Sequence, residues 1–507
     1  MIFAKKMKKH TLENILEIFG FILCTFVLAF IFNHLYKFCL HDEWSGRGLY
    51  PGIAFSRGYD LYNIGNGPYV TTYGWGTALF YSICGFAKTP DGAIATGYLL
   101  NIFSISFGLL GLVYFTINKT NNKSETLCLS IYFFLITISF LLIEKTTFTF
   151  LYLHADTPAI VFIIFSVIFF IIFSYNKSFI FLNLVCLCLV LSVWAKTPVL
   201  PCILLPAISL LLEKDFKHLY KYVISLVVWS FLTYLVSSYY YGSKDMLFYL
   251  FENHSNNRWS SRNHLFDGSD AELLQMSYFE AIPLLFKFFV MYFEEYWYFL
   301  LSACMCLKLS FSKTDFQILF KLTSILYFLL LPPCLAALAH FGGVENSLLF
   351  VNTLGSICIS LIILNCILFF SSNKILKNAV LTIIICLLFL PSVRRSKASP
   401  NISESAHQQA YNYLKKGNND IFFGWYPIAH VLANEENLTS LEIPIWVGMS
   451  KPEYIHFSLD DFPNNSSVFA TCHIGYGMTV LQNYLGELVE ISPPDELDKW
   501  RLFKAKR

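Results

Sequence analysis

The feature that most constrains this chain is a succession of apolar runs, each about 20 residues long, between residues 15 and 392. A helix of that length crosses the hydrocarbon core of a bilayer. Only 14% of the 507 residues are charged, whereas soluble domains carry about 25%. Because a span in lipid must satisfy its own backbone hydrogen bonds, the runs predict helices. The sequence therefore predicts an all-α polytopic membrane protein.

The apolar runs predict about eleven spanning helices. Their expected ranges are residues 15–36, 92–117, 127–144, 158–175, 178–195, 198–213, 219–240, 281–305, 316–338, 347–370 and 378–392. The stretch from Tyr73 to Ala87 is left out, since its 15 residues include three glycines and are nearer the length of an interfacial or re-entrant segment.

Lysines indicate the orientation of these spans. With a cytoplasmic N-terminus, nearly all loop lysines fall on the inner side, as the positive-inside rule requires. The basic start followed by the run at 15–36 resembles a signal sequence, but the run is too long and lacks a cleavage site, so we expect an anchor. The expected outer segments are 37–91, 144–157, 241–280 and 339–346, together with the C-terminal tail.

The tail from residue 393 to residue 507 differs in kind from the membrane module at 1–392. It is polar, and two segments, 420–424 and 467–472, are typical of short buried strands, each followed by a helix-like stretch. The sequence therefore predicts a small α/β domain outside the membrane.

Several function classes are excluded. Basic residues are dispersed, with no basic patch that has interleaved aromatics, so nucleic acid is not an expected partner. Nearly all of the 14 cysteines lie in apolar runs and lack zinc spacing. There is no Gly-x-x-x-x-Gly-Lys-Ser/Thr loop for a nucleoside triphosphate. No cofactor is predicted.

The strongest chemical signal is His41-Asp42-Glu43-Trp44, directly after the first span. Two adjacent carboxylates at a membrane surface are costly to desolvate. Such a group keeps its charge and gains basicity from partial burial, so Asp42 or Glu43 is a candidate general base for a sugar hydroxyl. The alternative is that both are simply solvated beside the helix end.

The residues that follow carry a resemblance to a known superfamily. Gly58-Tyr59-Asp60-Leu61-Tyr62, then Asn66-Gly67-Pro68 and Tyr73-Gly74-Trp75, come in the order seen in the first outer loop of GT-C glycosyltransferases. The likeness covers roughly residues 15–200, and Trp75 replaces a common proline. It implies a GT-C-like module that uses polyprenyl-phosphate sugars, Asp42 as the catalytic base with Glu43 beside it, and Tyr73 as a substrate-binding residue.

A second acidic residue, Asp156, begins the predicted fourth span and corresponds to an acidic residue near the active site of that superfamily. It could instead cap the helix. Together with His154 it could hold a divalent cation, but two ligands are a weak signal and no metal is expected. Lys196, at the end of the fifth span, is a candidate to bind a lipid phosphate, or could snorkel to the surface.

Two later outer loops supply further candidates. Arg258 and Arg262 suit bidentate phosphate binding, although the loop could be merely hydrated. His340 and Glu345 flank a Gly-containing turn that resembles one in many relatives, and they are candidates to line the pocket; a plain turn is the alternative.

These residues predict a transferase that moves a sugar from a polyprenyl-phosphate donor to a glycan or lipid acceptor, with inversion, at the periplasmic face of a bacterial inner membrane. Composition and size are similar to enzymes that add glucose to O-antigen. The rival interpretations are a polysaccharide or lipid transporter, which the sixth span's Pro198, Pro201 and Pro206 favour, and a non-catalytic scaffold.

Overall fold

The computed structural model describes most of the membrane module and part of the tail. The described residues are 43–59, 61–62, 74–117, 123–143, 153–241, 246–247, 259–260, 273–274, 276–277, 279–340, 345–370, 404–418, 420–433, 468–471, 486–497 and 500–505, with single positions between 22 and 30, between 380 and 387, and at 482. Most of the first and last predicted spans therefore lie outside the described residues.

Each predicted span between residues 92 and 370 coincides with a helical segment. They are α4 (Pro90–Ile117), α5 (Lys123–Ile143), α6 (Asp156–Asn176), α7 (Phe179–Ala195), α8 (Leu204–Leu212), α9 (Phe216–Tyr241), α12 (Ile282–Leu309), α13 (Gln317–Ala339) and α14 (Leu349–Phe370). Among the described residues, α4, α6, α9, α13 and α14 are the five helices long and apolar enough to cross a membrane.

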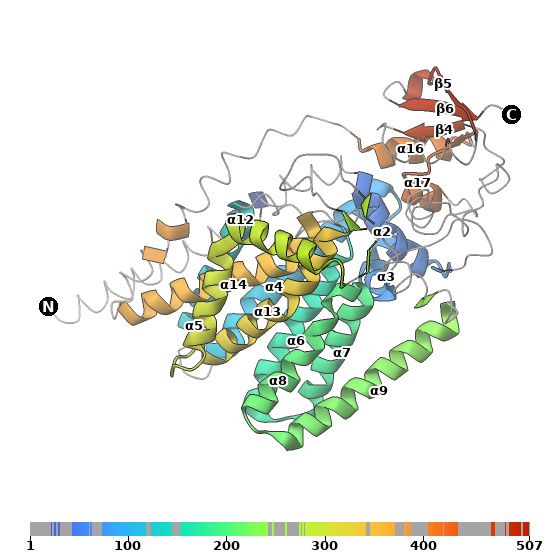
Figure 1. The fold of residues 1–507 in the computed structure, drawn as a ribbon. Coiled ribbons are helices and arrows are strands. Elements are labelled where there is room, and N and C mark those ends of the chain that lie inside the picture. The colour runs from blue at the N-terminus through green and yellow to red at the C-terminus, as the bar shows by residue number, and fades with distance from the viewer. Residues whose placement is uncertain are drawn as a thin grey trace.

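Helices α4, α5, α6, α7, α13 and α14 form a bundle, and α9 lies at its edge (Figure 1). In the most apolar stretch of α6, 72% of the residues are buried, against 17% in α9. The side chains of α9 therefore present an apolar face that lipid would cover. Small residues allow close packing inside the bundle, because a Cβ on Gly108 of α4 would lie 2.7 Å from the side chain of Ile164 of α6.

The predicted span at 198–213 is not one continuous helix. Residues Thr197–Ile203 form a 3-10 helix, η3, which leads into α8. Pro198 and Pro201 lie within η3. A proline donates no backbone hydrogen bond and clashes with the preceding turn, which accounts for the break.

The predicted span at 281–305 is a bent helix. Within α12, Tyr296 has φ −125° and ψ 25°, which interrupts the helical geometry. Before this bend, Ile282, Phe286 and Phe293 are exposed apolar side chains, while Lys287 and Glu294 are exposed beside them. An apolar stripe beside a charged one is typical of a helix that lies along the surface of a membrane.

Short helices occupy the first outer segment. They are α2 (Glu43–Ser56), α3 (Trp75–Tyr81) and the 3-10 helix η1 (Ser82–Phe86). Neither α3 nor η1 is long enough to cross a bilayer, in agreement with leaving 73–87 out of the spans.

The C-terminal part contains a four-stranded sheet with the order β3-β4-β6-β5. β3 (Ile421–Phe422) is parallel to β4 (Val468–Thr471), and β6 (Arg501–Ala505) is antiparallel to both β4 and β5 (Leu488–Ile491). The two predicted strands are β3 and β4. Helices α16 (Ala406–Lys415) and α17 (Pro427–Leu432) accompany the sheet at the end of the molecule where α2 lies (Figure 1).

Helix α17 joins the sheet to the membrane module. Its Ile428 and Val431 are buried in the same hydrophobic cluster as the spanning helices, whereas Ala429 is buried with the sheet. On α2, Arg47 Nε donates to the carbonyl oxygen of Trp425 at 3.3 Å, and Arg57 donates to that of Val431. Helix α17 and the residues just before it are therefore attached to α2.

Glycines allow α2 to fit between its neighbours. A Cβ on Gly48 would lie 1.3 Å from the carbonyl oxygen of Leu153, and one on Gly46 would lie 2.0 Å from the ring of His407. Real side chains cannot approach so closely, so only glycine is compatible with this packing.

We predict that Gly48→Ala destabilises the protein, because the new Cβ meets backbone that cannot move aside. The loss of unfolding free energy is expected to be about 1–3 kcal/mol, which overpacking typically costs. Gly92→Ala is the control, since its Cβ would lie 3.1 Å from a side-chain oxygen. Thermal unfolding in detergent measures both variants; equal midpoints would contradict the assignment.

Candidate functional site

The site is built where α6 begins and α7 ends. The two helices are consecutive neighbours, so the start of α6 lies beside the end of α7. Asp156 is the first residue of α6, and Lys196 directly follows Ala195, the last residue of α7. The ammonium of Lys196 donates to Asp156 Oδ1 in an ion pair.

A histidine completes this charged cluster. His154 Nδ1 lies 2.5 Å from Asp156 Oδ2, so both carboxylate oxygens of Asp156 are engaged. The Asp156 side chain is fully buried, while those of His154 and Lys196 are 13% and 14% exposed. A buried carboxylate needs such partners, and the positive end of the α6 dipole also favours its charge. Asp156 thus does more than cap the helix.

Helix α3 braces the end of α7. Thr77 Oγ1 donates to the carbonyl oxygen of Ala195 at 3.1 Å. A Cβ on Gly74 would lie 1.5 Å from the carbonyl oxygen of Trp194, so the two backbones are in direct contact. The rings of Trp75 and Trp194 are 6.1 Å apart. These contacts fix the backbone that precedes Lys196.

The same short helix also braces the loop before α6. The hydroxyl of Tyr81 lies 3.0 Å from Asn101 Oδ1 and 3.3 Å from the carbonyl oxygen of His154. Asn101 is a fully buried polar residue in α4. Sequence reasoning did not select Tyr81, Asn101 or Thr77; a lone asparagine inside an apolar span was the available signal.

Helix α2 contacts the loop before α6. Its Gly48 packs on Leu153, the residue before His154, and α2 begins at Glu43. Among the predicted residues between 37 and 91, Asp42 and Tyr73 lie outside the described residues. The loop that carries His154 and helix α2 are therefore in direct backbone contact.

Two other outer segments meet each other. The ring of His340 stacks on Trp259 with centroids 4.0 Å apart and an angle of 28°. Trp259 begins β1 (Trp259–Ser260), which pairs with β2 (Leu273–Leu274), and its Nε1 donates to the carbonyl oxygen of Met276 at 2.9 Å. Glu345 begins the 3-10 helix η5 (Glu345–Leu348). Arg258 and Arg262 lie outside the described residues.

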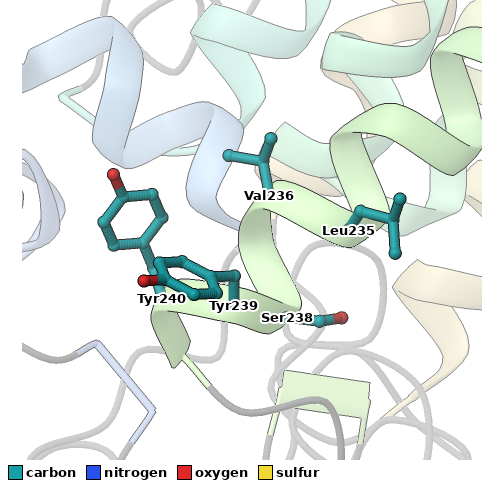
Figure 2. Close-up of a pocket in the computed structure, with 5 residues that line it drawn as sticks. All are labelled: Leu235, Val236, Ser238, Tyr239 and Tyr240. Carbon is teal, nitrogen blue, oxygen red and sulfur yellow. The ribbon is translucent and has the colours of Figure 1, made fainter.

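An open recess lies at the C-terminal end of α9. It has a volume of about 570 Å³ and is lined by Leu235, Val236, Ser238, Tyr239 and Tyr240 (Figure 2). The rings of Tyr239 and Tyr240 are perpendicular, with centroids 5.4 Å apart. Helix α9 is tied to α7 just before the recess, because Trp194 Nε1 donates to Thr233 Oγ1 at 2.9 Å.

No candidate metal centre is found in the described part of the chain, where no group of three or more histidine, cysteine, aspartate or glutamate residues converges. Asp156 and His154 are together, but the third partner is the ammonium of Lys196.

No family model and no curated protein sequence match this chain. Its structure is similar to that of ArnT from Cupriavidus metallidurans bound to undecaprenyl phosphate, with a TM-score of 0.50 and 10% sequence identity. The match covers 95% of this chain and 98% of the other. The chain has the GT-C fold. The GT-C fold expected from the first outer segment is confirmed.

We predict that Lys196→Met strongly destabilises the protein, because it leaves the buried charge of Asp156 without its ammonium partner. The expected loss of unfolding free energy is about 3–5 kcal/mol. The double variant Asp156→Asn, Lys196→Met should recover most of that loss, since neither charge remains.

The control is Lys177→Met, which removes an ion pair with Asp215 from a side chain that is 40% exposed. Such a surface pair contributes at most about 1 kcal/mol. Chemical denaturation in detergent compares the three variants. Equal losses from Lys196→Met and Lys177→Met would show that the Asp156 pair is not a buried one.

Proposed function

We propose that this protein is a membrane glycosyltransferase that moves a sugar from a polyprenyl-phosphate donor to a glycan or lipid acceptor. The observation that carries the proposal is the cluster of Lys196, Asp156 and His154 at the ends of two helices in a GT-C fold. An ammonium held in place beside the membrane is suited to a phosphate that leaves during sugar transfer.

Lys196 is the phosphate-binding group in this proposal. The ion pair with the buried Asp156 holds the ammonium in place and limits its rotamers, so little reorganisation is needed when the phosphate departs. Asp156 has both oxygens engaged and therefore acts through Lys196 and His154 rather than as the base. Arg258 and Arg262 bind the same phosphate, and Tyr73, His340 and Glu345 line the pocket.

Asp42 is the general base, with Glu43 beside it. The acceptor hydroxyl gives its proton to Asp42 and attacks the anomeric carbon from the face opposite the phosphate. A new bond forms from the acceptor oxygen to that carbon, and the carbon–oxygen bond to the phosphate breaks. The polyprenyl phosphate leaves with the electron pair, and the sugar is transferred with inversion.

The lipid chain of the donor lies against an apolar surface in this proposal. The recess at the C-terminal end of α9 is lined by Leu235, Val236 and two tyrosines, and α9 is tied there to the helix that ends at Lys196. A polyprenyl chain in the bilayer can enter beside it while the phosphate reaches the ammonium. ArnT was solved with undecaprenyl phosphate, and the same carrier is our proposed donor lipid.

The reaction takes place on the periplasmic side of a bacterial inner membrane. In this arrangement the N-terminus is cytoplasmic, and the C-terminal domain from residue 393 stands outside, where it selects the acceptor. O-antigen glucosylation is the proposed reaction, on the likeness in size and composition.

A transporter of lipid or polysaccharide is the second candidate, and the break between η3 and α8 favours it, because transporters use interrupted helices. Such a protein would carry its ionisable groups in the middle of the spans. Here Asp156 and Lys196 stand at helix ends, which favours the transferase.

We predict that Asp42→Asn lowers the rate of sugar transfer by about 10²–10⁴-fold, the typical contribution of a general base. Turnover of undecaprenyl-phosphate glucose, followed by mass spectrometry of surface glycans and of the released lipid, measures the loss. Asp215→Asn is the control, because Asp215 pairs with Lys177, which follows α6 at the end opposite Asp156. Wild-type transfer by Asp42→Asn would remove the proposed base.

The proposed orientation makes a separate prediction. A cysteine placed at position 42 should react with a membrane-impermeant maleimide added from the periplasmic side of intact spheroplasts, whereas one at position 215 should react only after lysis. Labelling of position 42 from the cytoplasmic side alone would overturn both the orientation and the lipid-borne donor.

A further inference from the structure

The indole of Trp75 has an unusual environment. Its Nε1 is buried and has no hydrogen-bond acceptor, although part of the side chain remains exposed. Four other described tryptophans differ in this respect. The Nε1 of Trp194 donates to Thr233, and that of Trp229 donates to Asn183. The Nε1 of Trp259 donates to the carbonyl of Met276, and that of Trp500 donates to Gln409.

Leaving such a donor unpaired is costly, and a buried unpaired group in a native protein calls for an explanation, such as a bound ligand. The backbone on both sides of Trp75 is packed closely on α7. Gly74 contacts the carbonyl of Trp194, and a Cβ on Gly76 would lie 2.7 Å from the carbonyl of Leu191. These contacts hold the backbone of Trp75 against α7.

The position of Trp75 relates this donor to the charged cluster. Its ring lies 6.1 Å from that of Trp194, which is two residues before Lys196. Two residues after Trp75, Thr77 donates to the carbonyl of Ala195, adjacent to Lys196. Trp75 therefore lies beside the end of α7 that Lys196 follows.

We infer that the indole N–H of Trp75 donates a hydrogen bond to an oxygen at the sugar-phosphate end of the polyprenyl-phosphate sugar. This inference rests on the proposed function. The acceptor atom is either a phosphate oxygen or a sugar hydroxyl, since both accept from an N–H. Trp75 is then a substrate-binding residue. It stands where the superfamily pattern has a proline, and its indole supplies a hydrogen-bond donor that proline lacks.

The test compares the full-length protein with its Trp75→Phe variant, which keeps an aromatic ring but lacks the N–H. Binding is measured in nanodiscs with two probes, undecaprenyl phosphate and undecaprenyl-phosphate glucose. The expected weakening is about tenfold, the value of one hydrogen bond. The midpoint of thermal unfolding should not fall, because no hydrogen bond within the protein is lost. Trp229→Phe is the matched control and should leave both affinities unchanged.

The two probes identify the acceptor. Weaker binding of both by Trp75→Phe supports a bond to the phosphate, and weaker binding of the glucose-bearing lipid alone supports a bond to the sugar. Unchanged affinity for both overturns the inference.

A further variant distinguishes this failure from that of the proposed function. Asp156→Asn with Lys196→Met lacks the ammonium but leaves no buried charge. If it binds both lipids more weakly while Trp75→Phe does not, only the inference about Trp75 fails. If neither variant weakens binding, the proposed function fails as well.

Discussion

The arrangement of the segments around the start of α6 and the end of α7 depends on one buried ion pair, that between Asp156 and Lys196. A carboxylate with no exposed surface is tolerated only if its charge is matched, so the start of α6 and the end of α7 must remain together. His154 holds the other oxygen, and Tyr81 holds the backbone of His154. The cluster therefore holds both helix ends together.

Close backbone contacts also hold the surrounding segments against these two helix ends. Gly48 brings α2 onto the residue before His154, and Gly74 brings α3 onto the end of α7. On the far side of α2, α17 contributes to the core of the membrane module and to that of the sheet. Helix α17 therefore links the sheet to α2 and, through Gly48 of α2, to the loop before α6.

Much of the fold could be predicted because a spanning helix is recognisable from its own consecutive residues. A run of apolar residues as long as a bilayer is thick has few alternatives to a helix, and α4 and α13 appear where expected. The interruptions inside two of these segments were not predicted, at the prolines before α8 and at Tyr296 in α12. Strands β5 and β6 were missed, since each is only four or five residues long and mixes charged with apolar residues, as many loops do.

The sequence by itself determined the class of protein, the spans and the separate candidacy of Asp156 and Lys196. Only the tertiary structure decided that these two charges, 40 residues apart, form a pair, and that His154 joins them. It also decided that the indole of Trp75 is left without an acceptor. The reason is physical: apolar runs report burial in lipid residue by residue, whereas the partner of a charge or a donor depends on which helix ends the packing brings together.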